Sequence, residues 1–130
     1  MANDLHVELV SAERVVWSGE ANEVLAKTVD GDLGVLRGHT PVLSLLAEGV
    51  VEILPDGGGN VVAAVDGGFL SVAKDRVSIL SEHVELAGEI DRAQAEAELE
   101  AAQAAADTDE DAAKRVKRAE ARLRAADKVS

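Results

Sequence analysis

The feature of this chain that most constrains its fold is a change of pattern at Gly88. Before it, short runs of β-branched and apolar residues are separated by glycine-rich turn signals, as at residues 55–60 and 66–68. After it, residues 89–128 contain no glycine or proline and are rich in Ala, Glu, Arg and Lys, which favour helices. Short strands at close spacing are typical of an antiparallel sandwich or flattened barrel. We therefore predict an α+β chain with a β-sandwich domain over residues 1–87 and a helical domain over residues 88–130.

The first domain has the alternation of strands with one buried face. Leu5, Val7 and Leu9 alternate with His6 and Glu8, which is the period of two expected of a half-buried strand. Trp17 and Phe69 are the only aromatic residues of the chain, so we expect a core of Val, Leu, Ile and Ala. Further strands are expected over residues 15–17, 24–28, 50–54, 61–65, 69–72 and 77–80.

The second domain contains two helical segments separated by a polar, acidic cluster at residues 106–111. This pattern predicts an antiparallel helical hairpin, with Thr108 or Asp109 capping the second helix. The side chains expected to face inward are mostly alanines, which bury little apolar area, so the hairpin should be marginally stable and able to change conformation. They are Ile90, Ala93, Ala97, Ala101 and Ala104 on the first helix, and Val116, Ala119, Leu123 and Ala126 on the second.

The charges of the two helical segments are segregated. Residues 89–111 hold nine acidic residues against one arginine, whereas residues 112–130 hold seven basic residues against two acidic ones. One interpretation is that the antiparallel helices attract each other across solvated faces. The other is that the basic helix can also leave its neighbour and bind a different acidic surface. Both interpretations fit the sequence.

Overall composition excludes several classes of function. The net charge of −12 argues against direct binding to nucleic acid or to an anionic membrane surface. The chain has no cysteine, which excludes disulfides and thiolate chemistry. Its apolar runs are far shorter than the ~20 residues that a membrane span needs, and its N-terminus lacks the pattern of a signal peptide. We therefore expect a soluble protein on the cytosolic side.

Residues 30–41 combine three glycines with two acids, an arginine and a histidine. Such density of glycine predicts a loop that displays its polar residues. The segment lacks the GxxxxGK[ST] pattern of a phosphate-binding loop, and the three histidines of the chain are not spaced as metal ligands. No glycine-flanked nucleophile appears either. We therefore expect neither a catalytic residue nor a bound metal, and interpret the segment as a docking loop.

The order of several motifs resembles a known family. Residues 31–35 read GDLGV, residues 38–41 read GHTP, and residues 67–70 read GGFL, ahead of a two-helix tail that begins near residues 89–91. In this order they resemble the epsilon subunit of the bacterial F-type rotary ATP synthase, essentially end to end. The resemblance implies an N-terminal antiparallel β-sandwich, or flattened barrel, of about ten strands, followed by a C-terminal two-helix hairpin.

The resemblance also implies a function. Such subunits are non-catalytic parts of the proton-translocating ATP synthase, peripheral to the cytoplasmic face of the bacterial cell membrane. They couple the c-subunit ring and the gamma subunit to the catalytic head, and the hairpin can extend to the catalytic beta and alpha subunits and block ATP hydrolysis. The residues implied for docking to the c-ring and stalk are Asp30, Gly31, Asp32, Gly34, Gly38 and His39, and those for inhibitory contacts of the tail are Lys114, Arg115, Arg118 and Arg122.

Some members of this family bind ATP through a motif of the form [IL]-D-x-x-R-A together with arginines of the second helix. Ile90 and Asp91 match the motif, but Gln94 stands where it has arginine, so a nucleotide is not expected to be required. The residues implied for such a site are Glu85, Asp91, Arg118 and Arg122. Two alternatives to the coupling subunit follow: an ATP-sensing module whose hairpin clamps the nucleotide, and a stand-alone sandwich adaptor with an acidic helical tail.

Overall fold

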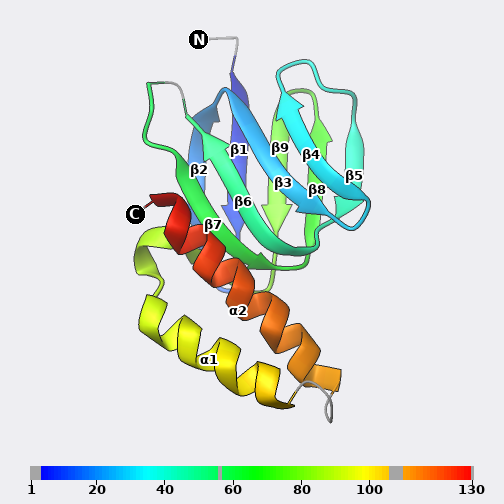
Figure 1. Cartoon of the computed structure of the whole chain (residues 1–130). Coiled ribbons are helices and arrows are strands. Elements are labelled where there is room, and N and C mark those ends of the chain that lie inside the picture. The colour runs from blue at the N-terminus through cyan, green and yellow to red at the C-terminus, as the bar shows by residue number, and fades with distance from the viewer. Residues whose placement is uncertain (1–3, 56, 106–109, 130) are drawn as a thin grey trace.

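The computed structural model describes residues 4–55, 57–105 and 110–129, so the caps predicted at Thr108 and Asp109 lie outside the described residues. It consists of ten strands, a short 3-10 helix η1 and two α-helices (Figure 1). This confirms the α+β fold class predicted from the sequence. The elements are β1 (Leu5–Val10), β2 (Val15–Ala21), β3 (Glu23–Thr28), β4 (Gly31–Leu36), β5 (Val42–Leu45), β6 (Glu48–Leu54), β7 (Val61–Asp66), β8 (Phe69–Ala73), β9 (Arg76–Leu80), β10 (Val84–Leu86), η1 (Ala87–Glu89), α1 (Arg92–Ala105) and α2 (Glu110–Val129).

The strands form two five-stranded sheets that pack face to face. Sheet A has the order β2–β1–β9–β8–β5, and sheet B has the order β10–β7–β6–β3–β4. Neighbouring strands are antiparallel except β1 and β9, which are parallel and bring His6 opposite Arg76 and Val10 opposite Leu80. The sandwich is therefore antiparallel throughout the described strands apart from this one pair.

The core lies between the sheets because each strand turns alternate side chains inward. In β1, Leu5, Val7 and Leu9 are completely buried while their neighbours are partly exposed. The facing strands add side chains of the same kind, so the core consists of Val, Leu, Ile and Ala, as expected. Phe69 is exposed rather than buried, and Trp17 packs only at the edge of the core.

The two helices form the predicted hairpin on the outer face of sheet B. In Figure 1, α2 lies across β6 and β7, and α1 lies beyond it, away from the sheet. Ala121 and Ala125 of α2 pack with Val62 and Ala64 of β7 and with Ala87. In the described residues neither helix is long and apolar enough to span a membrane.

The structure corrects the predicted inward face of α1. The residues expected there, Ala93, Ala97, Ala101 and Ala104, are exposed, and Ala95 and Ala102 are buried instead. Alanines occur on every side of this helix, so their positions carry no information about its orientation. On α2 the prediction holds for Ala119, but Ala112, Ala121 and Ala125 are buried as well. The buried surface of α2 is wider than predicted because this helix contacts both α1 and sheet B.

Candidate functional site

The segment predicted to be a docking loop, residues 30–41, is a strand over half of its length. Residues 31–36 form β4, which pairs with β3 at the edge of sheet B, so the prediction of one continuous loop is wrong. Leu33 and Val35 face the core and impose the alternation of a strand. A two-residue turn at Val29 and Asp30 joins β3 to β4. Gly31 closes this turn with a φ of +126°, a conformation that favours glycine.

The turn between β3 and β4 is fixed by its neighbours. The hydroxyl group of Thr28 donates a hydrogen bond to the Gly31 carbonyl oxygen at 2.7 Å and accepts one from the Asp30 amide at 3.2 Å. The Val29 amide donates to the Leu45 carbonyl oxygen at 3.0 Å, which ties the turn to β5 of the other sheet. The exposed Asp30 carboxylate therefore extends from a backbone that these hydrogen bonds hold in place.

Gly38 and His39 lie at the opposite end of β4. Gly38 has a φ of +83°, and its amide donates a hydrogen bond to Asp75 Oδ1 at 2.6 Å. His39 Nδ1 lies 2.7 Å from the Thr40 carbonyl oxygen. A strand advances about 3.3 Å per residue, so these residues lie on the order of 15–20 Å from the turn at Asp30. The six residues predicted to dock therefore do not form one compact site.

Asp32 and Gly34 belong to a third place, the outer face of sheet B. Asp32 lies opposite Lys27 in the strand register. The two side chains line a shallow cleft beside α2, together with Arg124 and Lys128 from that helix. Asp32 thus lies next to the hairpin, a position that the sequence did not indicate.

Sequence reasoning missed an apolar row on the outer face of sheet A. The strand register brings one exposed or half-exposed apolar side chain from each strand to the same level of the sheet. The alternation within a single strand did not indicate this row, because the row forms only when the five strands are paired. Its members are Leu45, Phe69, Leu80, Val10 and Val15, in the order of the strands from β5 to β2.

The row lies at the same end of the sandwich as the turn at Asp30, because Val29 is hydrogen-bonded to Leu45. Val29 is itself exposed and extends the row toward that turn. Apolar side chains gathered on one surface are typical of a site that contacts another protein. We call these six residues the sheet A row.

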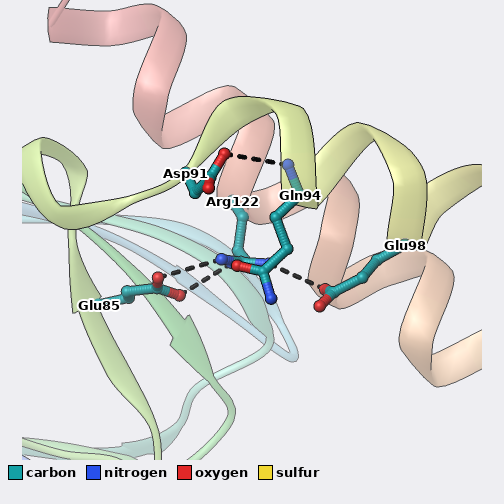
Figure 2. A network of polar contacts seen from close by, with 5 residues as sticks. All are labelled: Glu85, Asp91, Gln94, Glu98 and Arg122. Carbon is teal, nitrogen blue, oxygen red and sulfur yellow. Dashed lines mark hydrogen bonds and ion pairs between the residues drawn. The ribbon is translucent and has the colours of Figure 1, made fainter.

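Two of the arginines predicted for inhibitory contacts, Arg118 and Arg122, form ion pairs with carboxylates of the same chain. Figure 2 shows Arg122 of α2 between Glu85 of β10 and Glu98 of α1. Its Nε and Nη2 donate to the two carboxylate oxygens of Glu85 at 2.8 and 3.1 Å, and its Nη1 donates to Glu98 at 2.8 Å. Arg122 is only 8% exposed. Partial burial by itself would lower the pKa of this guanidinium group, but the hydrogen bonds and charges of Glu85 and Glu98 outweigh it, and the pKa is raised.

Arg118, one helical turn before Arg122, is bound to sheet B. Its Nη2 donates to Asp66 Oδ2 at 2.7 Å. Glu48 lies opposite Asp66 in the strand register, and its Oε2 is buried without a hydrogen bond from any described residue. Burial and, after it, the charge of Asp66 raise the pKa of the Glu48 carboxyl group. The charges of Arg118, Lys117 and Lys114 lower the pKa of Glu48 in part but do not offset this rise.

Asp91 and Gln94 hold the start of α1. The Gln94 amide donates a hydrogen bond to Asp91 Oδ1 at 3.1 Å, so Asp91 acts as a helix cap. The Gln94 side chain extends from α1 in the direction of the Arg122 guanidinium group (Figure 2). The neighbouring Arg92 is turned toward α2, where it contacts Asp127. Of the residues implied for a nucleotide site, Glu85 and Arg122 form an ion pair, and Arg118 lines the same cleft. The Asp91 carboxylate instead accepts the hydrogen bond from the Gln94 backbone amide.

The remaining residues predicted for inhibitory contacts, Lys114 and Arg115, are exposed near the start of α2. In the described part of the chain there is no group of His, Asp and Glu side chains arranged to hold a metal ion. The sequence did not single out Glu98 or Asp66. The segregated charges indicated that the helices would pair, but they did not indicate which carboxylates would meet the arginines.

Comparison with known proteins gives a consistent result. Residues 4–87, the β-sandwich, match the family described as ATP synthase, Delta/Epsilon chain, beta-sandwich domain. The chain is 54% identical over 125 residues to an ATP synthase epsilon chain of Streptomyces griseus, covering 96% of this chain and 97% of that relative. It is 52% identical over 129 residues to an ATP synthase epsilon chain of Thermobifida fusca, covering 97% and 94%.

Solved structures share the fold at low sequence identity. A chain of the Euglena gracilis mitochondrial ATP synthase, a structure of OSCP, F1 and c-ring, superposes with a TM-score of 0.78 at 24% identity, covering 98% of this chain and 81% of that one. A chain of the Tetrahymena thermophila mitochondrial ATP synthase, from a structure of the central stalk and c-ring, superposes with a TM-score of 0.54 at 17% identity, covering 70% and 69%. The Euglena match covers the helices as well as the sandwich.

Proposed function

The chain belongs to the ATP synthase epsilon chain family, and on that premise we propose that it is a central-stalk subunit that couples the c-ring and the gamma subunit to the catalytic head. An epsilon chain is a non-catalytic subunit of the ATP synthase. Its contribution must therefore come from the surfaces it offers to its neighbours. As part of that complex it would lie at the cytoplasmic face of the bacterial cell membrane, as a peripheral protein.

The observation that carries this proposal is that the hairpin covers the outer face of only one of the two sheets. The hairpin lies on the outer face of sheet B. On the outer face of sheet A, the sheet A row remains exposed, with Leu45 at 51%, Phe69 at 50% and Leu80 at 51%. Burying such a surface against a partner is favourable at about 25 cal/mol per Å² of apolar area. We assign this row to the gamma subunit, which would hold the sandwich on the stalk.

The turn between β3 and β4 suits the second contact of a coupling subunit. Asp30 is exposed on a backbone fixed by Thr28 and by the hydrogen bond from Val29 to Leu45. A rigid polar turn beside an apolar surface can orient the subunit against polar loops of the c-ring. Asp32 and His39, the other candidates, lie apart from this turn and would serve different contacts.

The hairpin is the proposed inhibitor of ATP hydrolysis. The second helical segment is basic, and Lys114 and Arg115 near its start are exposed. If α2 leaves sheet B, Arg122 becomes accessible and Arg118 is released from Asp66, and the helix presents four cationic side chains to an acidic surface of the catalytic subunits. Complementary charge of this kind increases association rates and weakens with salt.

A required nucleotide is not part of this proposal. Glu85, Arg118 and Arg122 do line one cleft, which favours the ATP-sensing alternative in part. However, Gln94 stands at the place of the motif arginine, and Arg122 is already bound to two carboxylates. A phosphate group would have to displace Glu98 or Glu85 to reach it.

The gamma contact is tested by the substitution Leu45→Glu, which puts a charge into the sheet A row. The matched control is Leu36→Glu, because Leu36 is similarly exposed, at 57%, but belongs to sheet B. We expect Leu45→Glu to weaken binding of the purified chain to the gamma subunit at least tenfold, since a buried unpaired charge is costly. Equal binding by both variants and the native chain would contradict this assignment.

The inhibitory role is tested by removing residues 112–130. The shortened chain should still bind gamma, because the sheet A row lies in the sandwich, while ATP hydrolysis by the assembled complex should rise. Unchanged hydrolysis would refute inhibition by the hairpin and leave the coupling role intact.

Substituting Asp30 or Asp32 by Ala should weaken proton-coupled ATP synthesis without lowering the thermal stability of the isolated chain.

A further inference from the structure

Three ion pairs hold α2 on sheet B, and the carboxylate of each pair belongs to a different strand. Arg118 contacts Asp66 of β7 at 2.7 Å, and Arg122 contacts Glu85 of β10 at 2.8 Å. Lys128 lies 3.5 Å from Glu52 of β6. Basic residues spread along α2 are thus matched to carboxylates on three strands beneath it. The pairs fix both the position and the direction of the helix on the sheet.

Arg122 is the centre of this arrangement because it also reaches α1. Its guanidinium group joins β10, α2 and α1 through Glu85 and Glu98 (Figure 2). The planar fork of arginine suits two carboxylate oxygens of Glu85 at once. Glu98 takes the remaining Nη1 position. The charge that α2 brings to the interface is therefore satisfied by residues of this chain.

The apolar part of the same interface is small. The residues of α2 that pack with Val62 and Ala64 are Ala121 and Ala125, and alanine buries little area when it packs. A partly buried charge that loses its partner is left unsatisfied, which destabilises an interface more than the loss of a surface pair does. The carboxylates around Arg118 and Arg122 therefore decide whether the hairpin stays on the sheet.

From this we infer that Glu98, together with Glu85 and Asp66, forms a charge latch that holds the hairpin folded without a nucleotide. Glu98 binds Nη1 of Arg122 while Glu85 binds Nε and Nη2, so the guanidinium group is paired on all of its nitrogens by carboxylates of this chain. The latch carboxylates also compete with any external acidic surface for Arg118 and Arg122. Arg122 is only 8% exposed and cannot serve both partners at once, so release of the latch is required for its contact with another subunit. That last step rests on the inhibitory role proposed above.

The latch is tested in the full chain with Glu98→Gln, which removes the charge but keeps size and helix propensity. Glu100→Gln is the matched control, because Glu100 is exposed on the same helix and forms no ion pair with any described residue. The readout is amide hydrogen exchange in α2, with far-UV circular dichroism to verify equal helix content. We expect exchange in α2 to be faster by about tenfold in Glu98→Gln, as for loss of one charged hydrogen bond, and unchanged in Glu100→Gln. Equal exchange in both variants would overturn the latch.

Two further measurements separate the parts of the inference. Addition of MgATP should leave exchange in α2 of the native chain unchanged; protection by MgATP would overturn the claim that no nucleotide is needed. In the assembled ATP synthase, Glu98→Gln should lower ATP hydrolysis, because the released arginines reach the catalytic subunits more often. Faster exchange with unchanged hydrolysis would support the latch and count against the inhibitory role of the hairpin.

Discussion

The sandwich and the hairpin are stabilised by different means. In the sandwich, large side chains such as Leu5, Ile53, Leu70 and Ile79 are completely buried between the sheets. In the described part of the hairpin the buried residues are alanines and Arg122. Contacts between buried apolar side chains cannot be replaced by contacts with another subunit unless the sandwich opens. An ion pair of the hairpin, in contrast, can be replaced by a pair with a carboxylate of another subunit. The comparison suggests a permanent platform that carries a helix pair able to move.

The largest effect is expected from a cavity in the platform. Leu70→Ala removes a completely buried side chain and should lower the free energy of unfolding by about 2–5 kcal/mol. Leu123→Ala removes a half-buried side chain from α2 and should cost less than about 1.5 kcal/mol. Both values can be measured by urea unfolding followed by circular dichroism. Equal costs would break the comparison between the two regions.

The next effect concerns the fit between α2 and sheet B. Ala125 is completely buried in this interface, so Ala125→Leu should force the helix away at a cost of about 1–3 kcal/mol. Hydrogen exchange should become faster in α2 and stay the same in β1 and β9. Ala97→Leu on the exposed side of α1 is the control and should change neither region. Faster exchange of the sandwich core would show that the two regions unfold together.

A smaller effect is expected at Glu48, where the platform meets α2. Its pKa in the folded chain is raised above the ordinary value of 4.5 by burial and by Asp66. The ionised carboxylate therefore destabilises the folded state, beginning as pH rises through the ordinary value and in full above the raised pKa. Glu48→Gln should be more stable than the native chain at pH 7, and the difference should vanish at pH 3. Thermal unfolding at several pH values measures this, and a less stable variant at pH 7 would contradict it.

The smallest effect is that of salt. Raising the salt concentration from 0.1 to 1 M shortens the screening length from about 10 to 3 Å. The half-exposed pairs Arg118–Asp66 and Lys128–Glu52 should weaken, by less than about 1 kcal/mol in total. Hydrogen exchange should therefore become slightly faster in α2 and remain unchanged in the sandwich core. An equal response of the two regions would remove the distinction between apolar and ionic stabilisation.

Local patterns in the sequence predicted the platform well. The alternation in β1 corresponds to a real strand, and the turn signals at residues 57–58 and 67–68 lie between β6 and β7 and between β7 and β8. The glycines of residues 31–38 concealed β4, since a strand with few large side chains has little pattern to detect. The face of α1 was predicted wrongly for a similar reason, because alanines on every side of a helix do not mark the buried one.

The candidate sites were predicted only in part. Arg118 and Arg122 stand out as a pair on one face of a basic helix, and Glu85 was recognised through the family resemblance. Glu98, the second partner of Arg122, did not stand out among the many acids of α1. The sheet A row could not be seen either, since its members are spread from Val10 to Leu80 and no short window contains more than two of them.

By itself, the sequence determined a β-sandwich followed by a helical hairpin, the segregation of charge between its helices, and the family. These properties depend on residues that are neighbours along the chain. The tertiary structure decided which carboxylates meet Arg122 and which apolar side chains form the sheet A row. The contacts of Arg122 join residues 24 and 37 positions apart, and the sheet A row places Val10 beside Leu80. These contacts depend on strand register and on how α2 lies against sheet B. Strand register and the placement of α2 are set only when the whole chain packs. No local pattern specifies the distance between segments that are remote in sequence.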